Sequence, residues 1–278
     1  MGWLLLCVML GANDDARIAG NARQAESVNF RVDCRSARHD AREVARLCED
    51  WRTKMLQTWR SQDELADWQV DCLVVVHSSR ASYVAAVGRG GNFSLGSSWI
   101  EYKQQVVSKR QIDLLPGELG ELSALGHEMT HVVVADYFGG KQLPRWADEG
   151  MAILADSSQK RRLHQRDLQS AIVQRQSFHA AELLAVTDYP AHARIPAFYG
   201  QSASLVAYLC RRESPAKFLE FVQLAMQQGH EHSIREVYGI KGHAELEQLW
   251  RADLAAAVDF HGFQLALAGE ARQAAATP

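Results

Sequence analysis

Two histidines and a glutamate stand close together in the segment HEMTH, which covers residues 127–131. The flanking residues are helix formers, and an α-helix places positions i and i+4 on one face, one turn apart. The imidazoles of His127 and His131 can therefore bind the same metal ion, and this arrangement favours zinc. Glu128 lies beside them and can take a proton from a water on that metal. The segment thus indicates metal-assisted hydrolysis.

A zinc site of this kind still needs a third protein ligand. Glu149 supplies one in LPRWADEGMA, residues 143–152, which we expect to form the next helix, with Pro144 at its start. Gly150 follows it and is expected to let this helix pack closely against the metal helix. Three ligands leave a fourth position open for water, as in catalytic zinc sites, whereas a structural zinc would need a fourth protein ligand.

HEMTH followed by PRWADEGMA resembles the gluzincin metallopeptidases, in which a glutamate from a WxxEG helix completes the zinc site. The likeness is greater to the bacterial peptidase MA-like proteins, whose LPRWxxEGxA and FYxQS elements both occur here, and it covers roughly residues 70–250. This resemblance implies a zincin-like fold and a metallopeptidase with one Zn2+ per chain, held by His127, His131 and Glu149. Glu128 would be the general base in hydrolysis of a peptide or protein substrate.

Two carboxylates are expected to support the ligands without touching the metal. Asp156 stands where the aminopeptidase branch of the gluzincins has a second carboxylate, and its spacing from Glu149 would put both on one helix face. Asp148, next to Glu149, is assigned the same supporting role. Carboxylates in such positions orient the ligand side chains.

A hydrogen-bond donor for the oxyanion is expected downstream of the ligands, where gluzincins commonly use a tyrosine or histidine. Tyr199 lies in FYGQS, which resembles the FYxQS element, and is the candidate. Tyr189 and Tyr208 are the alternatives. Solvated or packing roles are expected for three other histidines, His164, His230 and His232.

The elements around these residues predict an α+β fold. Residues 39–140 read as a mixed α/β lobe with a helix from Asp40, a strand at 70–77, a helix at 80–87 and short β-prone pieces over 92–115. Residues 141–265 read as an α-helical lobe, with candidate helices at 159–174, 196–212, 215–228, 232–238 and 243–260. By resemblance, the HExxH helix lies at the junction, the cleft lies between the lobes, and one β-prone piece binds extended substrate by strand addition.

The composition is that of a globular protein, with 47% hydrophobic and 23% charged residues. A net charge of −3 and the lack of an extended basic cluster give no support for binding nucleic acid. Neither a P-loop nor a dinucleotide-binding fingerprint occurs in the sequence. No integral membrane segment is expected, and the oligomeric state is left open.

The N-terminal residues 1–12 form an apolar run that is too short to span a bilayer and stands where a signal peptide would be. We therefore expect an exported protein, periplasmic, secreted or in the cell envelope, although the run lacks a basic n-region and a cytoplasmic location stays open. Residues 13–38 are expected to be a linker leading to a first strand at 28–32, and residues 266–278 a frayed tail. The cysteines at 34, 48, 72 and 210 would permit disulfides after export or be buried thiols otherwise.

Among peptidases, an endopeptidase is favoured over an aminopeptidase, because the sequence lacks the GxMEN element that aminopeptidases use to hold a free amine. The alternative from another class is a catalytically inactive zincin-fold module that binds a peptide or a cell-envelope partner. Glu128 argues against that alternative, since binding alone does not require a base beside the metal.

Overall fold

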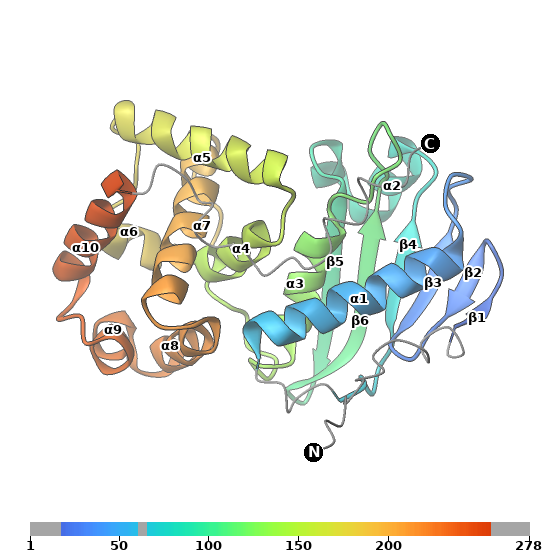
Figure 1. Cartoon of the computed structure of the whole chain (residues 1–278), viewed down its shortest axis with the longest axis horizontal. Helices are drawn as coiled ribbons and strands as arrows, with labels where there is room; N and C mark the ends of the chain where they lie inside the picture. The colour runs from blue at the N-terminus through green and yellow to red at the C-terminus, as the bar shows by residue number, and fades with distance from the viewer. Residues whose placement is uncertain (1–17, 61–65, 257–278) are drawn as a thin grey trace, which may run out of the picture.

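The computed structural model describes residues 18–60 and 66–256. The expectations for residues 1–12 and 266–278 lie outside the described residues. Within them, a six-stranded sheet with its helices occupies one side of the molecule and a group of helices the other (Figure 1). The α+β class is thus confirmed, and the arrangement is compatible with a zincin-like fold.

The sheet has the strand order β1-β2-β3-β4-β6-β5. Its strands are β1 (Ala19–Gly20), β2 (Gln24–Glu26), β3 (Phe30–Cys34), β4 (Cys72–Val76), β5 (Gly96–Lys103) and β6 (Val106–Leu114). The neighbours β3, β4 and β6 are parallel, whereas β5 pairs with β6 as an antiparallel hairpin and forms an edge of the sheet. The described part of the expected linker therefore contributes three strands, and the strand expected at 28–32 begins at Phe30.

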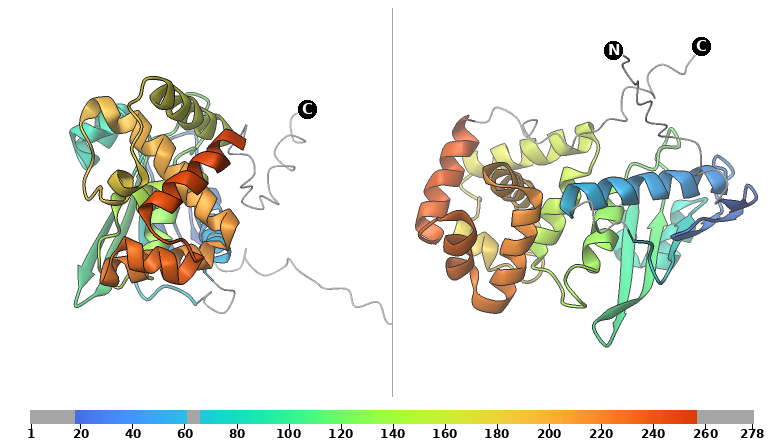
Figure 2. Two further views of the ribbon diagram at one scale, coloured as in Figure 1. Left: turned by 90° about the vertical axis from the view of Figure 1, so that its left-hand side faces the viewer. Right: turned by 60° about the horizontal axis from the view of Figure 1, so that its bottom comes forward.

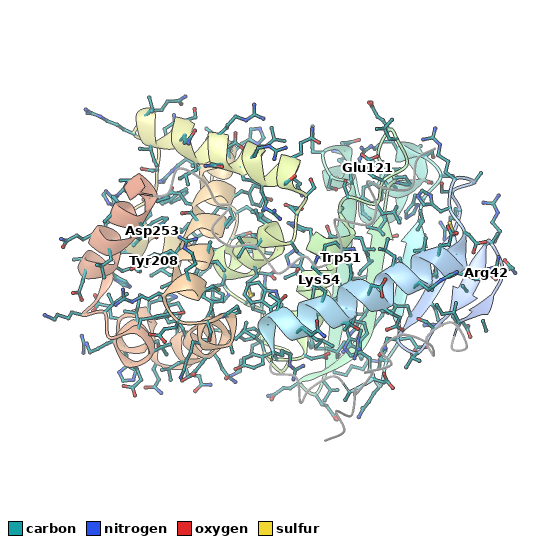
Figure 3. All side chains as sticks on the ribbon, viewed as in Figure 1. Arg42, Trp51, Lys54, Glu121, Tyr208 and Asp253 are labelled. Atoms are coloured by element: carbon teal, nitrogen blue, oxygen red, sulfur yellow. The ribbon has the colours of Figure 1, made fainter. Side chains whose placement is uncertain are left out.

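The long helix α1 (Ala41–Trp59) crosses one face of the sheet (Figures 1 and 2). Asp40 begins the helix, because its side chain accepts a hydrogen bond from the backbone N–H of Arg42. The helix α3 (Leu125–Ala135) packs between α1, β5 and α4. Trp51 of α1, labelled in Figure 3, lies so close to Gly126 of α3 that a Cβ there would be 2.6 Å from the indole. A residue without a side chain thus lets the two helices meet.

The opposite face of the sheet carries α2 (Arg80–Val87), whose Tyr83 packs edge-on against His77. His77 is buried, and one of its ring nitrogens lies 2.7 Å from Asp113 Oδ1 on β6. A 3-10 helix, η3 (Arg89–Asn92), leads from α2 towards β5. His77 and Asp113 thus form a buried polar pair, whereas most of the buried residues between the sheet, α1 and α3 are apolar.

The helical side is built around α7 (Ile195–Arg212), which lies among the other helices (Figures 1 and 2) and is buried over most of its length. Around it lie α4 (Arg145–Leu154), α5 (Ser158–Val173), α6 (Ala180–Leu184), α8 (Pro215–Gln228), α9 (His230–Tyr238) and α10 (His243–Ala256). Most of these helices agree with the sequence prediction within a few residues, but α6 and the short 3-10 helix η4 (His192–Arg194) were not expected. No helix in the described ranges is long and apolar enough to cross a membrane.

The prediction that Gly150 lets α4 pack closely against the metal helix was wrong. A Cβ at this position would lie 2.5 Å from Val206 Cγ2 and 2.7 Å from the Ser202 carbonyl oxygen, so the glycine admits α7 and not the metal helix α3. The reason is geometric: Gly150 is one residue after Glu149 and therefore points about 100° away from it around α4.

The four described cysteines, Cys34, Cys48, Cys72 and Cys210, are buried free thiols. Burial raises the pKa of Cys72 to about 12 and also raises the pKa of Cys48 and Cys210. These thiols therefore stay protonated and act as small apolar core residues.

Candidate metal centre

Helices α3 and α4 bring the three expected ligands together. His127 and His131 lie one turn apart on α3 with ring centroids 5.0 Å apart, and Glu149 approaches from α4. One donor atom from each residue falls within 4.8 Å of the other two. The chain can turn sharply between the two helices because Gly139 and Gly140 adopt positive φ angles. These three residues could therefore hold one metal ion.

A carboxylate lies beside Nδ1 of each histidine, as a hydrogen-bond partner of His131 and at ion-pair distance from His127. His131 Nδ1 lies 2.6 Å from Asp148 Oδ1, and His127 Nδ1 lies 3.4 Å from Asp156 Oδ1. Both carboxylates thus lie on the Nδ1 side of the rings, which leaves Nε2 available for a metal. His127 Nε2 is 3.6 Å from Glu149 Oε2, so these two donor atoms already converge.

Asp156 reaches this position differently from the sequence expectation. Helix α4 ends at Leu154, so Asp156 lies beyond it and does not share a helix face with Glu149. Its Oδ1 also accepts a hydrogen bond from Lys160 Nζ at 2.9 Å, while Oδ2 is 3.8 Å from His164 Nε2. The carboxylate is almost completely buried and is fixed by the start of α5.

The charges of the site favour a cation. Burial alone would lower the pKa of His127, but Asp156, Glu149 and Glu128 outweigh it and raise this pKa to about 10. Burial likewise opposes the charge on His131, but Asp148 and Glu149 raise its pKa to about 9. Burial would raise the pKa of Glu149, but the two histidines lower it to about 2. The carboxylates therefore create a negative environment that stabilises positive charge between them.

Glu128 is buried beside the ligands without being part of the cluster. It lies against β5, where a Cβ on Gly96 would be 2.7 Å from both Cγ and Oε1 of Glu128. The absence of a side chain at Gly96 thus creates the space that the carboxylate occupies. Sequence reasoning did not identify Gly96, because nothing in its local pattern distinguishes it from a turn glycine.

A cleft of about 1000 Å³ contains these groups. Its lining comes from β5, α3, α4 and α5 together with Tyr189 and Tyr199. The sequence left open which β-prone piece borders the metal helix, and the structure shows that this strand is β5, at the edge of the sheet. Its free edge offers backbone N–H and C=O groups to an extended chain.

The three candidate tyrosines differ in their position relative to the cleft. Tyr199 lines the cleft as expected, but Tyr189 is the one that contacts a ligand, since its hydroxyl donates a hydrogen bond to Glu149 Oε1 at 2.5 Å. The rings of Tyr189 and Tyr199 are 6.3 Å apart. Tyr208 lies far along α7, near Asp253 (Figure 3), and is not among the residues that line the cleft. Tyr189 belongs to an irregular loop, so no periodic pattern could have favoured it.

The three further histidines differ in whether they line the cleft. His164 lines the cleft and packs against Tyr199, with ring centroids 5.7 Å apart, and burial lowers its pKa. His230 and His232 belong to α9, which does not contribute to the cleft. His164 thus packs against a neighbouring ring, and it does so in the lining of the cleft.

A family model described as the Peptidase MA superfamily matches residues 117–256, which is half of the chain. The match includes α3, α4 and all the helices that follow them in the described residues. No curated protein matches the chain.

Proposed function

Because the chain belongs to the Peptidase MA superfamily, we propose that it hydrolyses peptide bonds with one zinc ion held by His127, His131 and Glu149. The observation that carries this proposal is the convergence of their donor atoms within 4.8 Å, with both Nδ1 atoms turned towards carboxylates. Two imidazole nitrogens and one carboxylate oxygen form a donor set that suits zinc. Asp148 and Asp156 would hold the imidazoles in the binding orientation.

Zinc bound to these residues would supply a Lewis acid, which acidifies a water and polarises the carbonyl of the substrate. Glu128 is next to the ligands, faces the cleft and is not needed for binding the metal. Its carboxylate would accept the proton of the attacking water and then deliver it to the leaving amine.

The two tyrosines would divide the remaining tasks. The hydroxyl of Tyr189 is occupied by Glu149 Oε1, which leaves Oε2 directed towards His127. Tyr189 would therefore position the ligand. Burial and the nearby Glu149 raise the pKa of Tyr199 to about 12, so its hydroxyl keeps its proton at neutral pH. Tyr199 would donate this hydrogen to the oxyanion.

The acidic groups of the cleft favour an endopeptidase over an aminopeptidase. Its lining carboxylates are Glu128, Asp148 and Glu149, and each of them has a partner or a proposed role in the site. Within the described residues, none is left to bind the free ammonium group of a substrate's N-terminus. An extended peptide would instead pair with the free edge of β5.

The test is to measure zinc content and cleavage of a mixed peptide library by the wild type and Glu128→Gln. Glu128→Gln keeps the size of the side chain but cannot accept the proton, so turnover should fall by about 100-fold to 10,000-fold at equal zinc content. Equal turnover by both proteins would contradict the role of Glu128. Zinc binding without any cleavage by the wild type would favour the alternative, a binding module.

A further inference from the structure

Arg145 is a cation in the cleft, close to the proposed ligand Glu149. It is the first residue of α4, one helical turn before Glu149, so both side chains extend from one face of the helix. Both residues line the cleft. The guanidinium carbon of Arg145 lies 5.1 Å from the ring centroid of Tyr189, whose hydroxyl binds Glu149. The ring of Tyr189 thus contacts Arg145 on its face and the proposed ligand Glu149 through its hydroxyl.

The charge of Arg145 has no counterpart in the described part of the chain. No ion pair joins it to a described carboxylate, and its Nε is buried without a hydrogen-bond acceptor. A buried charged donor without an acceptor is unfavourable. A cation in the first turn of a helix is also disfavoured by the helix dipole. Both costs disappear if a bound molecule brings an anion to this position.

The other charges of the cleft do not meet this need. Glu149 and Asp148 are engaged by Tyr189 and by His131, respectively. Lys160, a second cation of the lining, is already paired with Asp156. Lys141 is exposed and lines the cleft. Glu128 also lines the cleft, as the proposed base. Arg145 and Lys141 are therefore the lining cations without an ion pair among the described residues, and Arg145 is the more buried of the two.

We propose that Arg145 forms a subsite for a carboxylate of the substrate close to the scissile bond. The planar guanidinium matches a carboxylate with two parallel hydrogen bonds, which a lysine cannot form. The carboxylate can belong to an acidic side chain or to the C-terminus of the peptide. This inference rests on the proposed function, since it requires a peptide in the cleft.

The test uses binding, so that it does not depend on turnover. Peptides in which one Glu or one Gln occupies successive positions, each with a free or an amidated C-terminus, are titrated into zinc-loaded Glu128→Gln protein. One carboxylate position should strengthen binding by about tenfold to a hundredfold over its neutral counterpart, as expected for hydrogen bonds to a charged group. The Glu and free-terminus series identify which carboxylate is bound.

Further variants test whether the carboxylate preference depends on Arg145. Arg145→Met, made in the same Glu128→Gln background, should bring the ratio between acidic and neutral peptides to about one, and Arg145→Lys should leave only a part of it. Lys141→Met removes the same charge from the same cleft and is the matched control, which should keep the ratio. Zinc content and thermal unfolding of each variant show that its site and fold are intact.

The outcomes separate this inference from the proposed function. Equal binding of acidic and neutral peptides would overturn the subsite, as would an equal loss of preference in Arg145→Met and Lys141→Met. A carboxylate preference in binding, together with no cleavage by the wild type, would keep the subsite and overturn the peptidase. Cleavage by the wild type without a carboxylate preference in binding would keep the peptidase and overturn the subsite. Failure to bind any peptide would overturn both the subsite and the peptidase.

Discussion

Asp148 and Asp156 determine which nitrogen of each histidine is free. Each carboxylate lies next to an Nδ1 atom, so the Nε2 atoms remain for the metal. Tyr189 acts similarly on Glu149, because it occupies Oε1 and leaves Oε2 near His127. At the scale of single residues, the three proposed ligands are therefore oriented by their polar neighbours without a metal.

The first prediction concerns the pH dependence of the metal-free protein. The pKa of His127 is raised to about 10 and that of His131 to about 9, from about 6.5 in an unfolded chain. Their contribution to stability is therefore complete below about pH 6.5 and is lost as the pH rises through about 9 to 10. The pKa of Glu149 is lowered to about 2, so its contribution is present above about pH 4.5 and is lost as the pH falls through about 2.

The melting temperature of the chelator-treated protein should accordingly fall between pH 7 and pH 10. Zinc affinity should rise over the same interval, because each imidazole must release its proton to bind the metal. Thermal unfolding with and without zinc across this range measures both effects. A His131→Ala variant should show a smaller fall in the metal-free state, and a wild-type melting temperature that does not change would contradict the assignment.

The second prediction separates the two tyrosines of the cleft. Tyr199→Phe removes the proposed oxyanion donor and should lower kcat by about 100-fold to 1000-fold, with zinc content unchanged. Tyr189→Phe removes the hydrogen bond to Glu149 and should weaken zinc binding by about 10-fold to 100-fold. Competition with a chelator and turnover at saturating zinc distinguish these effects. Tyr208→Phe, on the same helix as Tyr199 but outside the cleft, is the control and should change neither value. Zinc loss in Tyr199→Phe would reverse the two roles.

At the scale of elements, β5 and α3 form one unit of the site. The strand passes so close to the helix that a Cβ on Gly96 would lie 2.7 Å from Ala124 Cβ as well as from Glu128. Real side chains do not tolerate such distances, and Ala124 has no flexible atoms that could move away. The strand that would bind substrate thus also fixes the position of the proposed base.

The third prediction follows from this contact. Gly96→Ala should separate β5 from α3 and displace Glu128, so that turnover falls by at least about tenfold while zinc content stays near that of the wild type. Gly90→Ala is the matched control, because a Cβ at Gly90 meets no atom within 4 Å. Turnover and zinc content are measured for both variants. Wild-type turnover in Gly96→Ala would mean that Glu128 does not depend on the close approach of the strand.

The features that could be predicted from the sequence are those set by local spacing. The pairing of His127 with His131 depends only on the helical period, and the start of α1 depends on the cap at Asp40. The β5–β6 hairpin was divided into short pieces because its turn uses Gln104 and Gln105 at positive φ. Turns of this kind normally contain asparagine or glycine, so the usual signal was missing.

Features that depend on distant parts of the chain could not be predicted in the same way. The contact of Tyr189 with Glu149 requires an irregular loop to return to the cleft, and no periodicity marks such a loop. The role of Gly150 depends on which helix packs behind α4, and only the assembled structure shows that this helix is α7. Asp156 was expected near the ligands through a helix face, yet it reaches His127 from beyond the end of α4.

At the scale of the whole molecule, an aromatic cluster joins the sheet side to the helical side. Phe218 of α8 is fully buried, with ring centroids 6.3 Å from Trp59 of α1 and 5.9 Å from Trp146 of α4. Trp146 lies less than one turn before Glu149 on the same helix. The cluster therefore fixes α4, and with it Glu149, relative to the part of the molecule that carries the two histidines.

The last prediction tests this connection with Phe218→Ala. Removing a buried phenylalanine should lower the free energy of unfolding by about 3–5 kcal/mol. Zinc affinity should also fall, because α3 and α4 both supply ligands and α4 would be less firmly held. Zinc binds the folded state, so saturating zinc should restore part of the lost stability. Denaturant unfolding of the metal-free and zinc-loaded proteins, with a chelator competition for affinity, measures these effects.

Phe93→Ala is the control: Phe93 is 96% exposed, so its loss should change the free energy of unfolding by no more than about 0.5 kcal/mol. A Phe218→Ala protein that is destabilised but binds zinc as tightly as the wild type would show that other contacts position α4.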